Sequence, residues 1–381
     1  MRNVYILGGL RTPIGKTGGF LKDLLPEDMV SMLIKALIKK YGVNSFDELY
    51  LGNAIGTGGN IARLSLLKAG LGFDTPATTI DFQCGSGLKA ICIACNKIKS
   101  GDADIIIAGG VESTSLRPRR QYNENDSRFR GSDVFYERAQ FSPEEIGDPD
   151  MITGAENTVE LFRLSREEMD QWALRSHKLA SRAFHENVLS DVILPVEIGG
   201  KKYFKDESIR DQINISILSR AKPVIPGGTI TGGNACLTHD GAALVILASE
   251  DKIKDFNTST LVKISHDASA GVDPNYPPIG AAAAVKKLLL KAGIAVEDID
   301  AFEINEAFAA KILTFKKELG VSEDKINIFG GALAYGHPYG ASGAIIVLHL
   351  MEFMKKRKLK NGVAGIGVAG GQGVAAMLTS T

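Results

Sequence analysis

The sequence is poor in cysteine, in proline and in long apolar runs. Its 381 residues include 4 cysteines and 13 prolines. So few cysteines cannot form a disulfide scaffold in a chain of this length, so we expect free thiols in the reducing cytoplasm. No apolar run approaches the roughly 20 residues that span a bilayer, and the opening segment 1–9 is too short and glycine-rich for a signal peptide. We therefore expect no membrane partner.

An excess of charge of either sign is also lacking. The chain carries 44 basic and 44 acidic side chains. Binding to nucleic acid needs a basic field, so we do not expect nucleic acid as the main partner. A hydrophobic fraction of 44% is normal for a globular protein and excludes a disordered chain. The length allows about two or three domains.

Short strand-like segments alternate with helical ones along much of the chain. The patterns predict strands at 4–7, 48–51, 104–108 and 242–247, and helices at 29–40 and 88–99. The 42 glycines gather beside apolar runs, which is typical of tight turns and close backbone contacts in an enzyme core. This alternation indicates a layered α/β fold with a mixed or parallel sheet.

The region from about residue 117 to 226 interrupts this alternation. Its first part, 117–130, is polar and has no apolar period. A helix is predicted to start at Ser165, because Glu168 completes a capping box with it. We interpret the region as an insertion into the α/β core.

The flanking parts of the chain echo one another. Segment 84–87, a helix, a strand and segment 108–110 occur in the first part, and 340–343, a helix, a strand and 369–371 occur in the second. The echo favours a duplicated fold with two similar halves. Chance matching of small residues is the alternative.

Cys84 is the first candidate for chemistry, because it lies between a predicted strand and the helix 88–99. Backbone N–H groups at a helix N-terminus favour negative charge, so this position predicts a lowered pKa of the Cys84 thiol. An inert buried thiol is the alternative.

Cys92 and Cys95 have C-x-x-C spacing within the apolar helix. They have no second pair and no histidine nearby, which favours core packing over a metal or redox role.

Two polar residues in the C-terminal part are further candidates. His337 lies in a loop between glycine and proline, where rigid backbone would place its ring as a general base. A histidine that only satisfies a turn is the alternative. Asn305 follows the strand-like segment 301–304 and fits either a helix cap or a ligand for a water or a substrate oxygen. Segment 365–370 fits G-x-G-x-x-G, but no acidic residue follows about 20 positions later, so dinucleotide binding is not expected.

Together these segments resemble the thiolase family nearly from end to end. The opening turn 11–16, the nucleophile segment 83–87 and the C-terminal signatures 305–309 and 336–343 all match. The resemblance implies a five-layered α/β/α/β/α fold of two similar halves with an inserted loop domain, and a homodimer or homotetramer. The implied boundaries are an N-terminal half 1–116, an inserted CoA-binding domain 117–241, a return to the first half at 242–250, and a C-terminal half 251–381.

The resemblance also implies the roles of the candidate residues. Cys84 would be the nucleophile that takes an acyl group from acyl-CoA, and His337 would deprotonate it. His337 and a water held by Asn305 would bind a thioester oxygen, and the backbone N–H groups of Cys84 and Ala369 would form a second oxyanion hole. Acyl-CoA and CoA would be the substrates, with no permanently bound cofactor and no metal.

CoA recognition is implied for the inserted region. Arg210 matches an arginine that lies against the adenine, and Cys236 stands where the family has a serine that contacts the pantetheine. Met151 matches a methionine of the acyl pocket. Two neighbours depart from the family pattern, because Asp150 replaces a histidine and Ile152 replaces a glycine.

The largest departure is Gly367, which stands where the family carries a second cysteine. That cysteine exchanges a proton with the α-carbon of the second substrate, and loss of such a group typically costs about 10²- to 10⁴-fold in rate. Three functions remain open: a thiolase of fatty acid metabolism with a substitute for the cysteine, a decarboxylating condensing enzyme, and a non-catalytic acyl-CoA-binding protein. The signatures around Asn305 and His337 favour the thiolase, either an acetyl-CoA C-acetyltransferase or a 3-ketoacyl-CoA thiolase.

Overall fold

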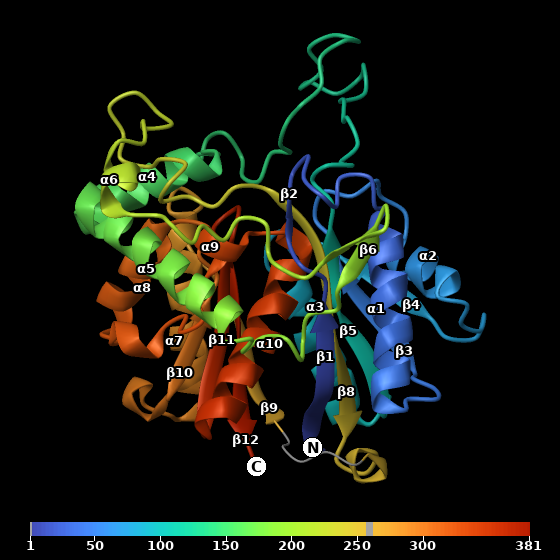
Figure 1. Ribbon diagram of the computed structural model, residues 1–381. Coiled ribbons are helices and arrows are strands. Elements are labelled where there is room, and N and C mark those ends of the chain that lie inside the picture. Colours follow the sequence, from blue (N-terminus) through green and yellow to red (C-terminus); the bar gives the residue numbers. More distant parts are fainter. Residues whose placement is uncertain (1, 257–261) are drawn as a thin grey trace.

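The core of the molecule is a mixed sheet divided into two similar halves (Figure 1). The computed structural model describes residues 2–256 and 262–381. The described strands follow the order β4-β3-β5-β8-β1-β9-β12-β11-β10, and β2 pairs with β8. They are β1 (Val4–Arg11), β2 (Gly15–Lys16), β3 (Glu48–Gly52), β4 (Ala77–Ile80), β5 (Ile105–Glu112), β8 (His239–Ser249), β9 (Val262–Gly271), β10 (Ala301–Ile304), β11 (Asn361–Val368) and β12 (Gln372–Ser380).

Strand pairing repeats from one half to the other. In the first half β3 runs parallel to β5, and β5, β8 and β1 follow as antiparallel neighbours. In the second half β10 runs parallel to β11, and β11, β12 and β9 follow as antiparallel neighbours. Among the described residues, Tyr5–Lys263 and Ile6–Val262 join the two halves between β1 and β9. The predicted pair of similar halves is confirmed.

Helices complete the five layers. In Figure 1, α1 and α2 cover the outer face of the first half, α3 and α10 lie between the halves, and α7 and α8 cover the outer face of the second. The described helices are α1 (Pro26–Tyr41), α2 (Ile61–Lys68), α3 (Ser86–Ser100), α4 (Met151–Phe162), α5 (Arg166–His185), α6 (Ile215–Ser219), α7 (Gly280–Ala292), α8 (Ala309–Leu319), α9 (Ala332–Tyr335) and α10 (Tyr339–Arg357), with 3₁₀ turns η1 (Ile253–Asp255), η2 (Pro277–Ile279), η3 (Val296–Asp298) and η4 (Glu323–Lys325). This is the predicted five-layered fold.

Glycines at the start of the two central helices allow a close approach. A Cβ atom on Gly87 of α3 would lie 2.6 Å from the carbonyl oxygen of Gly340, and one on Gly343 of α10 would lie 2.2 Å from the Leu88 nitrogen. These glycines belong to the echoed segments of the sequence. The echo therefore has a physical cause, because each half supplies one side of the same tight helix contact.

The structure extends several predicted elements. The strand predicted at 4–7 continues through Gly8 and Gly9 to Arg11. A Cβ on Gly9 would lie 2.5 Å from both the Leu244 carbonyl oxygen and Leu348 Cδ2, so glycine serves close packing within the strand. The predicted helix 88–99 starts earlier, at Ser86.

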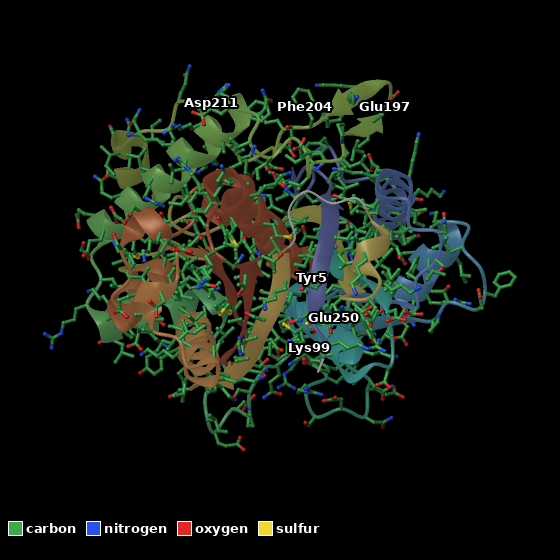
Figure 2. The ribbon with its side chains drawn as sticks, turned by 90° about the horizontal axis from the view of Figure 1, so that it is seen from below. Tyr5, Lys99, Glu197, Phe204, Asp211 and Glu250 are labelled. Carbon is green, nitrogen blue, oxygen red and sulfur yellow. The ribbon has the colours of Figure 1, made fainter. Side chains whose placement is uncertain are left out.

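The segment between β5 and β8 carries α4, α5, α6 and the hairpin β6 (Val196–Ile198) and β7 (Lys201–Tyr203). The capping box of Ser165 and Glu168 is present at α5. The buried Arg11 of β1 anchors the segment, since its guanidinium donates to both carboxylate oxygens of Asp206 at 2.8 and 2.9 Å. Figure 2 shows Glu197, Phe204 and Asp211 of the segment along one rim, away from Lys99 and Glu250.

Candidate active site

Cys84 lies in a tight turn between β4 and α3. Gln83 has a φ of 47°, and the Gly85 N–H donates to the Phe82 carbonyl at 3.0 Å. The Ser86 hydroxyl accepts from the Phe82 N–H at 2.8 Å and donates to the Gln83 carbonyl at 2.6 Å. The first residue of α3 therefore fixes the turn that presents the thiol.

The protonation of Cys84 differs from the expectation. Burial raises the pKa of the Cys84 thiol to about 11, although the positive charge of Lys311 acts in the opposite direction. The predicted lowering of the pKa is therefore wrong, because loss of hydration outweighs the nearby backbone amide and cation. A protonated thiol needs a base before it can attack a thioester.

His337 has the arrangement of such a base. Its Nδ1 lies 2.6 Å from Ser342 Oγ, and that hydroxyl donates to the Pro338 carbonyl at 3.0 Å. In the tautomer in which Nδ1–H donates to the Ser342 oxygen, the lone pair of the ring lies on Nε2. Nε2 is buried and has no hydrogen-bond partner among the described residues. Burial holds the pKa of His337 well below its usual value, so the ring is neutral and can accept a proton.

Asn305 lies beside this histidine. Its backbone N–H donates to the Gly365 carbonyl at 3.0 Å, and its Nδ2 lies 3.2 Å from His337 Nδ1. The alternative role as a helix cap is wrong, because α8 begins at Ala309 and its N-cap residue is Phe308. Asn305 is 1% exposed, and its side chain points toward the ring of His337.

Lys311 also reaches the site, although no sequence motif predicts a role for it. Its Nζ donates to the Gly367 carbonyl at 3.0 Å and to Asn305 Oδ1 at 3.4 Å. Its charge affects the pKa values of Cys84, Cys236 and His337. The available signal was a single charged side chain in the apolar stretch 307–315.

The turn after β11 lies beside the Cys84 turn. A Cβ on Gly85 would lie 2.9 Å from Val368 Cγ1, and Ala369 follows Val368 directly. At Gly367, a Cβ would lie 3.0 Å from the Ala281 nitrogen and 3.2 Å from the Pro277 carbonyl oxygen. Gly367 thus has no side chain and little room for one.

Two buried glutamates support the loops around the site. Glu112 accepts from the backbone N–H of Gly340, where α10 starts, and from Ala54, both at 3.0 Å. Burial raises the pKa of Glu112 to about 7. Glu306, next to Asn305, accepts from Trp172 Nε1 at 2.9 Å, Ser176 Oγ at 2.6 Å and Asn327 Nδ2 at 2.8 Å.

The residues expected to bind CoA lie in and beside the inserted segment. A small pocket is lined by Arg210, Ser208, Gly232, Gly233, Ala235 and Leu237, together with four further residues. Cys236 follows Ala235, and its backbone N–H donates to the Ala307 carbonyl at 2.9 Å, next to the candidate catalytic segment. Burial raises the pKa of the Cys236 thiol to about 12.

Met151 is the first residue of α4 and packs, partly buried, against the apolar cluster of the second half. The departure at Asp150 has a local explanation. Its carboxylate accepts from the backbone N–H groups of Ile152 at 2.9 Å and Thr153 at 2.8 Å, so it caps α4. The free thiols Cys92 and Cys95 lie buried in the core between the halves, in agreement with the packing role expected for them.

In the described ranges, no group of three or more His, Cys, Asp or Glu side chains is arranged to hold a metal ion. Every helix of the described residues is too short or too polar to cross a bilayer.

Comparison with known families identifies this architecture. The thiolase N-terminal domain matches residues 4–251, and the thiolase C-terminal domain matches residues 258–380. The chain belongs to the thiolase family, and it is an acyltransferase of the thiolase type.

Relatives and solved structures agree with this assignment. The chain is 40% identical over 381 residues to the "Putative acetyl-CoA C-acetyltransferase VraB" of Staphylococcus aureus strain MW2, with both chains covered completely. It superposes on the crystal structure of the Bacillus anthracis acetyl-CoA acetyltransferase with a TM-score of 0.93 and 35% identity, covering 100% of this chain and 99% of that one. Human mitochondrial 3-ketoacyl-CoA thiolase in complex with CoA gives a TM-score of 0.92 at 33% identity, covering 100% and 98%.

Proposed function

We propose that this thiolase works through an acyl-Cys84 intermediate, as an acetyl-CoA C-acetyltransferase or 3-ketoacyl-CoA thiolase. The observation that carries the proposal is the buried Nε2 of His337, which is neutral and has no partner among the described residues. It is the base that a protonated Cys84 thiol requires. The names of the relatives, an acetyl-CoA acetyltransferase and a 3-ketoacyl-CoA thiolase, support the same chemistry.

In the proposed mechanism His337 Nε2 takes the proton of Cys84, and the thiolate attacks the thioester carbonyl. The negative charge that develops on the carbonyl oxygen is held by the backbone N–H groups of Cys84 and Ala369. Asn305 holds a water that, with His337, binds the oxygen of the second thioester. The thiolate of CoA leaves, takes the proton from His337, and the acyl group stays on Cys84.

CoA binding is proposed for residues 117–241, with Arg210 and Cys236 as contacts and Met151 in the acyl pocket. Arg210 lines the small pocket with Ala235, and its exposed side chain forms no ion pair within the described ranges. That leaves its guanidinium free to lie against an adenine ring or a phosphate group. The CoA complex of the human thiolase supports a site of this kind.

We further propose a cytoplasmic homo-oligomer, dimer or tetramer, that serves fatty acid metabolism with no permanently bound cofactor. The thiolase halves 1–116 with 242–250, and 251–381, would form its core. These assignments rest on the family resemblance.

Acetylation of Cys84 tests the proposal. Incubation with acetyl-CoA followed by peptide mass spectrometry should place one acetyl group on Cys84 of the wild type and none on Cys84→Ser. Acetoacetyl-CoA and CoA should then yield two acetyl-CoA molecules. An unmodified wild type contradicts the proposal, and a label on Cys92, Cys95 or Cys236 shows that another thiol is the nucleophile. Condensation with malonyl-CoA in the absence of thiolysis would instead favour the decarboxylating alternative.

A further inference from the structure

Lys311 is a buried cation without an ion-pair partner in the described part of the chain. It is 1% exposed on α8, and the acceptors of its Nζ are the uncharged Gly367 carbonyl and Asn305 Oδ1. Lysines are rarely buried so fully unless they are paired, because loss of hydration is costly. An apolar side chain would suit this position better if packing were its purpose.

The Lys311 side chain reaches Gly367, the position that lacks the family's second cysteine side chain. Its Nζ lies 3.0 Å from the carbonyl oxygen of Gly367, the residue that replaces the second cysteine. An ammonium has three donor hydrogens, and these two acceptors use two of them. Among the described residues, the third N–H has no hydrogen-bond acceptor.

The protonation of Lys311 suits proton exchange in both directions. Burial lowers the pKa of Lys311 to about 8, and the neighbouring Cys84 and Cys236 oppose this shift. Near this pH the ammonium and the neutral amine are both populated. By contrast, burial raises the pKa of the Cys236 thiol to about 12, which makes it a poor proton donor and leaves it protonated.

We propose that Lys311 is a catalytic residue that moves the proton at the α-carbon of the acyl-CoA substrate, in place of the second cysteine. The inference rests on the proposed acyl-Cys84 intermediate. It deepens that function by assigning the acid and base of the carbon–carbon step.

The proton balance of thiolysis closes with this assignment. The Cys84 thiolate attacks the 3-keto carbon, the bond between C2 and C3 breaks, and its electron pair stays on C2. The Lys311 ammonium donates a proton to C2, which releases acetyl-CoA. The neutral Lys311 amine then takes the thiol proton of incoming CoA, whose thiolate attacks the acyl group on Cys84. In condensation the neutral amine removes the α-proton, and the steps run in reverse.

Three variants separate this role from a structural one. Lys311→Met keeps the length of the side chain and removes the amine. Lys311→Arg keeps the positive charge but cannot release a proton. Lys317→Met is the matched control on the exposed face of α8. Each is assayed for Cys84 acetylation, for thiolysis of acetoacetyl-CoA, and for deuterium uptake into the methyl group of acetyl-CoA in D₂O.

We expect both substitutions of Lys311 to lower thiolysis and deuterium uptake by about 10²- to 10⁴-fold, and Cys84 acetylation by less than about tenfold. Wild-type deuterium uptake should rise with pH through about 8, because the neutral amine is the base, and this rise should be missing in Lys311→Met. Lys317→Met should resemble the wild type in all three assays.

Other outcomes overturn the inference. Thiolysis within a few-fold of the wild type in Lys311→Met shows that another group moves the proton, and its loss in Cys236→Ala would identify that group. Equal losses of acetylation and thiolysis, or rescue by Lys311→Arg, show that Lys311 acts through its charge on Cys84. A wild type that is not acetylated on Cys84 contradicts the acyl-enzyme proposal itself, and the lysine step falls with it.

Discussion

The two central helices begin with similar short segments but present different chemistry. Before α3 the chain presents Cys84, and before α10 it presents His337. Ser86 uses its hydrogen bonds to close its own turn, whereas Ser342 bonds the Pro338 carbonyl and the ring of His337. The same feature in both halves, a helix that starts with small residues, thus holds the proposed nucleophile in one half and orients the proposed base in the other.

Of the changes at the two helix starts, removal of the His337 imidazole should have the largest effect. We expect His337→Ala to slow acetylation of Cys84 by about 10²- to 10⁴-fold, because a buried thiol with a raised pKa then has no base. Mass spectrometry of quenched samples gives the rate. His185→Ala, on the exposed end of α5, is the matched control and should react like the wild type. Equal rates for His337→Ala and the control would mean that the second helix start does not supply the base.

The second largest effect should come from adding a side chain where α3 and α10 are in contact. Gly343→Ala adds a methyl group 2.2 Å from the Leu88 backbone nitrogen, and neither backbone can move without shifting its helix. Alanine favours helix by about 1 kcal/mol over glycine, but overpacking should outweigh this gain and leave a net loss of about 2 kcal/mol. Denaturant unfolding measures the change.

Gly271→Ala is the control for this substitution, because no atom lies within 4 Å of its added Cβ. A Gly343→Ala protein as stable as this control would show that the helices can separate without cost, and the physical reason given for the echoed glycines would be wrong.

The serines should give the smallest effects, of two different kinds. Ser342→Ala removes a hydrogen bond to the His337 ring, worth about 1 kcal/mol, and should slow acetylation of Cys84 by about fivefold. Ser86→Ala should lower the free energy of unfolding by about 1 kcal/mol, because the Phe82 N–H loses its acceptor and the Gln83 carbonyl keeps only the Ser86 backbone N–H. Acetylation rates and unfolding curves of both variants test the contrast. Identical profiles for the two would show that the serines do not differ in role.

The site residues that were predicted from the sequence are those that lie in short contiguous motifs. Cys84 and His337 each lie in a short motif with its own glycines, and Asn305 directly follows the strand-like segment 301–304, so their identity could be read locally. The raised pKa of Cys84 could not, because burial depends on packing between segments far apart in the chain. Lys311 was missed for the same reason, since its contact with Gly367 joins residues that α9 and α10 separate.

The fold was predicted with similar limits. The capping box at Ser165 and the strand–helix alternation are local signals, and both are confirmed. The extension of β1 through Gly8 and Gly9 depends on what packs above them, here Tyr41, Leu244 and Leu348. The sequence contains both glycines, but it does not reveal which neighbours pack so closely that a larger residue would not fit.

The β5–β8 ladder has a consequence for the history of such a chain. Its register runs unbroken from Ile105 opposite Ala248 to Glu112 opposite Gly241. In the second half a turn at 369–371 joins the corresponding strands β11 and β12, whereas here a long excursion leaves and re-enters the sheet at fixed points. A gene duplicate can lengthen one such connection while the core is inherited unchanged. The asymmetry of the enzyme could thus evolve by insertion at a single hairpin, leaving the ancestral sheet to preserve the geometry of both copies.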